Sequence, residues 1–362
     1  MNKIYINSIK QISAQQPLSD DWFENPVFYS EPYIRAIDPD FKSFLSPNTA
    51  RRLGKILKRA LVVSQKTMEE SGVSNPDAII TGTGLGCIEN TELFLDKLVR
   101  EGEELLNPTQ FMQSTHNTIS SLIAIEAKCH SYNTTYAHKG ISFECALQDA
   151  FLQLSRTNPK KIDPTTALTG AYDEMTPTYF NLLKKAGYLG KPQQVFAGET
   201  AVAMMLATEK TEKTLCEIEA VEKVYSGVKG VKELEGVMKF EGINRLIDNR
   251  EVDYIMVGIN GDPKTDEIYY ENCAALFPGV PLLHYKHIFG ESYTAPALGV
   301  YAAALCLQKG KIPNFLMYEK QNAENIDSLK PYFLEETLVV NRILCYHHFE
   351  GKNHSFILLS KF

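Results

Sequence analysis

Short apolar runs that read as buried strands alternate with amphipathic helical segments along the whole chain of 362 residues. Three of these runs lie at residues 78–84, 166–171 and 253–259. Aliphatic runs of this length are typical of buried strands, and their alternation with helices favours layers of helices packed on sheets. The sequence therefore predicts an α/β layered fold.

Helices are predicted at residues 48–71, 89–101, 118–128, 139–154 and 291–310. Pro47 and Gly72 flank the first of them as start and stop signals. Its basic run, residues 51–59, is spaced as a solvated face, because apolar residues line the other side. The last helix is rich in alanine and is expected to be central. The Lys/Glu-rich section 209–241 predicts a surface excursion or a helix and loop at an edge of the fold.

The charge balance and the apolar pattern exclude two classes of partner. A net charge of −7 and a pI near 5.7 argue against a nucleic-acid partner, because no basic cluster is long enough to bind a phosphate backbone. No segment approaches the roughly 18 to 20 apolar residues of a membrane helix. The N-terminus lacks the apolar block of a signal peptide. A cytoplasmic protein without membrane insertion is expected.

The cysteines do not form a recognisable framework. The seven are scattered, odd in number and never in a CxxC pair, so neither a disulfide scaffold nor a zinc site is predicted. Most are interpreted as small buried hydrophobes. No metal and no cofactor is expected.

Residues 133–154 predict a short strand, a sharp turn and a helix with one apolar face. Many acyl-transfer enzymes hold a nucleophile at such a turn, because the helix N-terminus favours negative charge there. Here the turn carries Ala137, which has no nucleophilic atom. His138 follows it and either faces a pocket or simply begins the helix.

Five stretches, in order, resemble motifs of the β-ketoacyl-acyl-carrier-protein synthases of the thiolase-like fold. They are "IITGTGLGCIENT", "NPTQFMQSTHNTISSLIAI", "FAGETAVAMMLATEK", "YKHIFGESYTAPALGVYAAALCLQKGKIP" and "HFEGKN". The resemblance spans nearly the whole chain and implies a five-layered αβαβα fold of two pseudo-repeated halves. We call the predicted strand, turn and helix of residues 133–154 the elbow. We place the halves at residues 1–190, which carry the elbow, and 191–362, which carry the positions of the family's histidines. A faint echo between "LTGAYDEMT" and "MVGINGDPKT" is too short to prove a duplication.

The family's reaction uses a cysteine thiolate, which takes the acyl chain, and two histidines, which stabilise the oxyanion. Alignment of "TYAHKG" with the family's "TACASG" puts Ala137 at the cysteine, and Asn260 and Glu291 fall on the two histidines. Alanine cannot form a thioester, asparagine carries no positive charge, and an ionised glutamate repels an enolate. The resemblance therefore implies that condensing activity is lost.

Two family positions survive. Lys286 precedes Glu291 by five residues, and Phe349 resembles the gate at the acyl pocket. The family also has a glutamate nine residues after its second histidine, where this chain has Val300. We therefore expect Lys286 to form an ion pair with Glu291.

Competing interpretations concern cysteines, a histidine and a glycine-rich loop. Cys145 lies about two turns into the elbow helix, and Cys129 ends the preceding helix, where the helix dipole disfavours a thiolate, so both are interpreted as structural. His116 has no visible partner and is a structural histidine by default. The "TGTGLG" stretch lacks the Lys-Ser/Thr of a phosphate loop and the acidic residue of a dinucleotide fingerprint, so no nucleotide site is expected.

The resemblance implies a chain-length-factor type of protein, similar to those of aryl-polyene and flexirubin-type pathways. Such a subunit pairs with an active ketosynthase, receives chains from acyl carrier protein and shapes the tunnel in fatty-acid or polyketide biosynthesis. The dimer face is expected at His116, Asn117, Asn133 and Thr135. Two alternatives stay open: an acyltransferase with altered catalytic residues, and a homodimeric acyl-binding scaffold.

Overall fold

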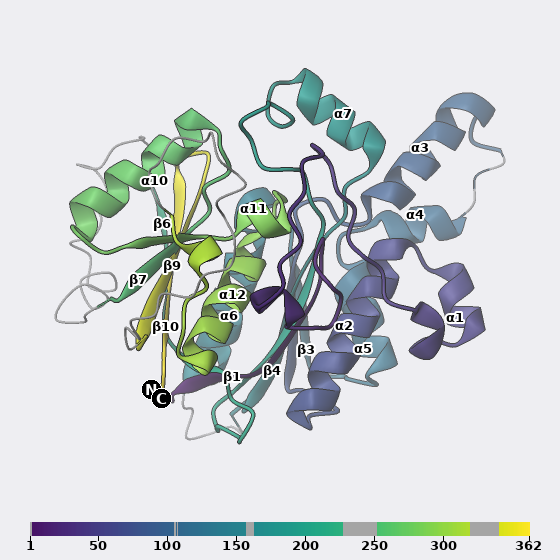
Figure 1. Ribbon diagram of the computed structural model, residues 1–362. Helices are drawn as coiled ribbons and strands as arrows, with labels where there is room; N and C mark the ends of the chain where they lie inside the picture. Colours follow the sequence, from purple (N-terminus) through teal and green to yellow (C-terminus); the bar gives the residue numbers. More distant parts are fainter. Residues whose placement is uncertain (1, 105, 107, 157–162, 227–251, 319–339) are drawn as a thin grey trace.

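The computed structural model describes residues 2–362 except 105, 107, 157–162, 227–251 and 319–339 (Figure 1). The strands are β1 (Ile4–Ile12), β2 (Ala78–Gly82), β3 (Tyr132–Tyr136), β4 (Thr166–Asp173), β5 (Thr200–Ala207), β6 (Cys216–Tyr225), β7 (Tyr254–Val257), β8 (Leu282–His284), β9 (Arg342–Phe349) and β10 (Asn353–Ser360). The helices are α1 (Pro47–Arg52), α2 (Lys55–Ser71), α3 (Ile88–Glu101), α4 (Pro108–Ser114), α5 (Thr118–Glu126), α6 (Ser142–Ser155), α7 (Pro177–Lys185), α10 (Pro263–Leu276), α11 (Lys286–Phe289) and α12 (Pro296–Lys309).

The sheet consists of two sets of five strands, β1–β5 and β6–β10, that are arranged in the same order from the outer edge to the centre. The full order runs β3-β2-β4-β5-β1-β6-β10-β9-β7-β8, so β1 to β5 and β6 to β10 occupy matching places. β2 pairs in parallel with β3 and β4, as β7 does with β8 and β9. The remaining pairs, including the central β1–β6 pair, are antiparallel. The boundary at residue 190 stays a prediction, and β5 beyond it pairs with strands of the first set.

The half-sheets β1–β5 and β6–β10 are joined at the β1–β6 pair. The helices α6 and α12 lie between them and other helices cover their outer faces, which gives five layers (Figure 1). On β5, Met204 and Leu206 pack toward the central layer that holds α6 and α12, whereas Met205 packs toward α2 and α5. On β9, Cys345 packs toward the central layer and Leu344 toward α10. Side chains alternate in this way because successive residues of a strand face opposite sides. The predicted αβαβα architecture is confirmed.

Helix α12 lies in the middle of the protein, as its composition predicts. Every residue from Pro296 to Leu307 is buried. A helix that is apolar on all sides needs neighbours on all sides, and small alanines allow that close approach. The helix begins later than predicted because Pro296 occupies its first turn and Glu291 bonds to a separate segment through Phe196 O and Gly198 N.

Three sequence predictions were wrong in detail. The first predicted helix is interrupted at Leu53 and Gly54, so α1 and α2 are separate. Within its basic run, Arg59 is not solvated: it is 1% exposed and forms ion pairs with Asp38 and Glu199. The section 209–241 is not only a surface excursion either, because its described part contains β6 at the centre of the sheet, while residues 227–251 lie outside the described residues.

The sequence echo does not follow the strand symmetry. Its two copies form β4 and β7, whereas the sheet order matches β4 with β9 and β2 with β7. The duplication is therefore visible in the order and direction of the strands and not in this pair of segments.

Replacement of Arg59 by methionine is expected to destabilise the protein by about 3 to 5 kcal/mol, because it leaves the buried carboxylate of Glu199 without its cation. Urea unfolding measures the change. Arg51→Met, on an exposed face of α1, is the matched control and is expected to change stability little. Equal losses in the two variants would contradict the assignment of Arg59 as a core ion-pair residue.

Candidate functional site

The predicted elbow is present, and Ala137 lies at its turn. β3 ends at Tyr136, a short 3-10 turn covers Lys139–Ile141, and α6 follows. Lys139 has a left-handed backbone with φ of 47°, which is unusual for a residue other than glycine. The backbone N–H of His138 donates to Ser142 Oγ at 2.7 Å, which holds the turn against the first residue of the helix. Ala137 and His138 are exposed.

Phe349 lies against this elbow. Its ring occupies the place where a Cβ on Gly140 would stand, so the turn and the end of β9 approach as closely as a glycine allows. The same ring meets Tyr293 edge-on, with 6.0 Å between the ring centroids. Tyr293 follows Glu291 by two residues. The contacts thus connect the elbow, the predicted gate and the segment that carries Glu291.

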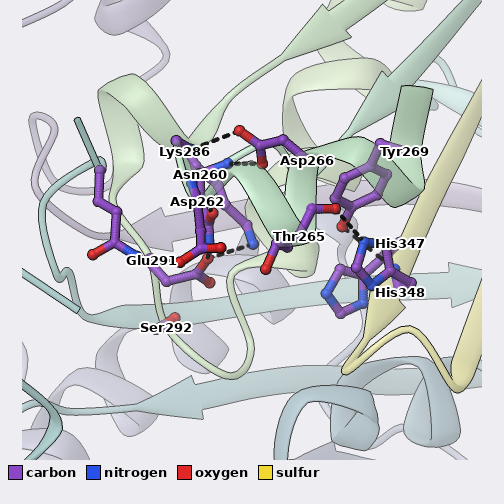
Figure 2. Close-up of polar contacts among 12 residues, drawn as sticks. Asn260, Asp262, Thr265, Asp266, Tyr269, Lys286, Glu291, Ser292, His347 and His348 are labelled. Carbon is purple, nitrogen blue, oxygen red and sulfur yellow. Dashed lines mark hydrogen bonds and ion pairs between the residues drawn. The ribbon is translucent and has the colours of Figure 1, made fainter. Parts of the chain in front are cut away.

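Asn260 and Glu291, the two positions that the sequence analysis aligned with the family's histidines, touch each other (Figure 2). Asn260 Nδ2 donates to Glu291 Oε2 at 2.8 Å, and Lys286 Nζ donates to the same oxygen, also at 2.8 Å. Lys286 is only 3% exposed, so its ammonium depends on this carboxylate. The predicted ion pair between Lys286 and Glu291 is confirmed. Asn260, Glu291 and Lys286 thus form one bonded polar cluster, and its correspondence to the family's two histidines stays a prediction.

Asp266 holds the backbone beside this cluster, and the sequence analysis did not identify it. Its two carboxylate oxygens accept from Asn260 N at 3.0 Å and Gly261 N at 2.9 Å (Figure 2). Burial raises the pKa of Asp266, while these two hydrogen bonds oppose the rise. The "GDPKTDE" string carried the available signal, because an Asp-Pro helix start with a second acid three residues after the proline favours such capping.

The predicted dimer-face residues gather around α5 and β3. His116 and Asn117 are exposed and immediately precede α5. Asn133 Nδ2 donates to Ser120 O at 3.0 Å, and the Thr135 hydroxyl is 2.6 Å from the Ser120 hydroxyl. β3 is the last strand of the sheet at this side, so its outer edge is unpaired within the described part of the chain. Their role at an interface stays a prediction.

The glycine-rich loop after β2 is bound to an internal carboxylate. Asp173 Oδ1 accepts from Gly84 N at 2.9 Å, Leu85 N at 2.8 Å and Thr83 Oγ1 at 3.0 Å. These backbone N–H groups are the donors that a phosphate would need. The contacts agree with the prediction that this loop is no nucleotide site. Burial raises the pKa of Asp173 to about 6.

Most of the cysteines are buried, as the sequence predicts. Six cysteines are buried and Cys145 is partly exposed. Cys129 Sγ lies 3.2 Å from Pro76 O in the core. Over the described residues, no helix has the length and apolar character needed to cross a membrane, and no cluster of three or more metal-ligating side chains occurs. At the turn of the elbow, Ala137 has no nucleophilic atom and cannot form a covalent acyl intermediate.

Replacement of Glu291 by glutamine is expected to cost about 3 kcal/mol, because it removes the charge that compensates the buried ammonium of Lys286. Chemical denaturation measures the loss. Glu69→Gln breaks the exposed ion pair with Lys66 and is the control, with a much smaller expected effect. The cluster is not structural if the two variants lose the same stability.

The buried carboxyl group of Glu174 is expected to make the free energy of unfolding depend on pH. Burial raises its pKa to about 7, above the ordinary value of 4.5. The folded protein therefore keeps a proton that the unfolded chain has lost, and stability falls as pH rises from 4.5 to about 7. Glu174→Gln removes this contribution, so its stability relative to the parent is expected to rise by on the order of 3 kcal/mol across that range.

Unfolding by urea at pH 4.5 and near pH 8 measures the difference. The glutamine keeps an acceptor for Glu89 N, which donates to Glu174 Oε1 at 3.0 Å. Glu267→Gln, on an exposed position of α10, is the control. An unchanged pH slope in the Glu174 variant contradicts the prediction.

Comparisons with known proteins agree with this architecture. A sequence profile for the β-ketoacyl synthase N-terminal domain matches residues 22–251. No curated protein matches the chain. Among solved structures, a ketosynthase in complex with its chain length factor from Xenorhabdus doucetiae, ApeO with ApeC, aligns with a TM-score of 0.80 at 13% identity, covering 100% of this chain and 98% of that one.

The ishigamide ketosynthase/chain length factor aligns with a TM-score of 0.76 at 15% identity, over 100% of this chain and 99% of that one. A β-ketoacyl synthase from Burkholderia phymatum aligns with a TM-score of 0.77 at 12% identity, over the full length of both chains. At these identities the structures establish the thiolase-like ketosynthase fold. Because the profile covers more than half of its residues, the chain belongs to the β-ketoacyl synthase family.

Proposed function

We propose that this protein is a non-condensing, chain-length-factor-like partner of an active ketosynthase. The observation that carries the proposal is the state of the three catalytic positions. Ala137 supplies no thiol. Asn260 carries no imidazole and donates to Glu291, and Glu291 accepts from both Asn260 and Lys286. A family member without its nucleophile can still line the pocket that holds the acyl chain and can still bind a partner subunit through its dimer face.

The surface around α5 and β3 supports a partner. Ile125, Met112, Phe111 and Tyr132 are large apolar or aromatic residues that are 72%, 61%, 56% and 44% exposed. They belong to α4, α5 and β3. β3 is an edge strand, so the peptide groups on its outer side are available to another strand. An apolar surface beside an unpaired edge favours association through strand addition and burial of side chains. The partner that we propose is a ketosynthase that keeps the cysteine and both histidines.

The proposed pathway setting follows from the family and from two of the similar structures, which are ketosynthases with their chain length factors. We propose polyketide or aryl-polyene-type chain assembly in the cytoplasm, with substrates delivered by acyl carrier protein. Phe349 is assigned to the wall of the acyl site because it packs on the elbow at Gly140. Lys286 supports that wall through Glu291, and His138 borders it.

Co-expression tests the proposal. The chain is produced with a tagged ketosynthase that keeps its cysteine and histidines, and with acyl carrier protein. Copurification and acyl products whose length depends on the presence of this chain are the expected results. Ile125→Glu is expected to abolish copurification, because association would remove water from the glutamate charge without providing a partner for it. Leu182→Glu, 57% exposed on α7, is the matched control and is expected to copurify normally.

Purified alone, the chain is expected to make no ketoacyl product from malonyl-carrier protein. Ala137→Cys is expected to remain inactive, because Asn260 and Glu291 cannot replace the two histidines. Condensation by the chain alone refutes the proposal and favours the altered acyltransferase. Self-association without any ketosynthase binding favours the homodimeric scaffold.

A further inference from the structure

A buried carboxylate in the elbow helix has unused hydrogen-bonding capacity. Glu144 lies in the first turn of α6 and is 0% exposed. Its Oε1 accepts from His347 Nδ1 at 2.6 Å and from Ser355 Oγ at 3.2 Å. Its Oε2 is buried and has no partner within the described structure. A buried carboxylate oxygen without a donor costs free energy, so this position requires an explanation beyond packing.

His347 is oriented by that carboxylate. The hydrogen bond assigns the Nδ1 proton to the side facing Glu144, which makes Nε2 the basic nitrogen of the neutral imidazole. No hydrogen bond from the described residues engages Nε2, and the side chain keeps 11% exposure. A histidine with one nitrogen held by a buried carboxylate and the other available has the arrangement of a general base.

Lys286 lies beside this imidazole. A Cβ on Gly258 would stand 3.3 Å from His347 Cδ2, 3.3 Å from Lys286 Cε and 2.6 Å from Tyr269 Oη. The carbon bonded to His347 Nε2 and the carbon bonded to the Lys286 ammonium therefore both border Gly258, the residue that follows β7. The ammonium has three N–H groups, of which one binds Glu291. A base and a cation thus border the same position at Gly258.

We propose that Glu144 and His347 form an acid–base pair that hydrolyses acyl thioesters, so that the chain has a release activity of its own. His347 Nε2 takes a proton from water while the water oxygen bonds to the thioester carbonyl carbon, and the Lys286 ammonium stabilises the oxyanion. The carbon–sulfur bond then breaks, and the imidazolium returns its proton to the thiolate. One water and one thioester give one carboxylic acid and one thiol, without an oxidant or a covalent enzyme intermediate.

The substrate class rests on the proposed function, because thioester-bound chains are what a ketosynthase partner encounters. The acid–base pair itself involves neither Ala137 nor the dimer face. The alternative role of Glu144 and His347 is a structural ion pair between α6 and β9. That role predicts a loss of stability in variants but no turnover, so activity and stability measurements separate the two.

The experiment uses the full chain alone with hexanoyl-N-acetylcysteamine, and the hexanoic acid released is measured by mass spectrometry. Acid production above the enzyme-free blank is expected, with a loss of about 100-fold or more in His347→Gln. Glu144→Gln keeps an acceptor but loses the charge, and is expected to lower kcat with little change in KM, as a positioning residue would. His354→Gln, a buried histidine of β10 bonded to Tyr346, is the matched control and is expected to keep full activity.

Thermal unfolding of each variant accompanies the assay, and Glu144→Gln carries the test if His347→Gln does not fold. No acid above the blank, or equal rates in the parent and both pair variants, overturns the inference. Product length in the co-expressed complex is measured separately, so failure of hydrolysis and failure of the partner role are distinguishable.

Discussion

The antiparallel pairing of β1 with β6 joins the two half-sheets, and the rest of the structure is organised around that connection. Only three residue pairs form it, Ile4 with Ile218, Tyr5 with Glu217 and Ile6 with Cys216. α6 and α12 pack against strands of both half-sheets. α12 is buried on all sides, whereas α6 buries one face and keeps a partly exposed one. Both helices follow the third strand of their set, so the elbow with Ala137 and the segment with Glu291 occupy corresponding places in the two halves.

Residues that are distant in the sequence form one bonded cluster around Glu291. Glu291 precedes α12, and its negative charge is compensated by Lys286 and by a hydrogen bond from Asn260. The same low-polarity layer makes an unpaired charge costly, so the polar groups there occur as bonded sets. Glu144 with His347 is the second such set, and it differs from the cluster at Glu291 because Glu144 Oε2 has no partner among the described residues.

Patterns of local sequence predicted the layers, the elbow and the central helix, because these depend on hydrophobic periodicity and on helix start signals. β6 escaped the same reasoning. Glu217, Glu219 and Lys223 alternate with its buried residues, and such alternation in a Lys/Glu-rich section resembles a surface strand or loop. Its place between β1 and β10 is set by pairing with strands from both ends of the chain. Arg59 was misread for a related reason, since a charged residue on a helix is usually solvated.

By itself, the sequence indicated the buried strands β2, β4 and β7 and the approximate places of the main helices. It also showed that the elbow carries alanine and that Glu291 follows Lys286 by five residues. Only the tertiary structure decided which distant charges meet. Glu144 and His347 are 203 positions apart, and Arg59 and Glu199 are 140 apart. No local pattern encodes such pairs, because each residue taken alone is compatible with a solvated surface. Burial in the shared layers removes the water that would otherwise satisfy these groups, and the fold then requires them to satisfy one another.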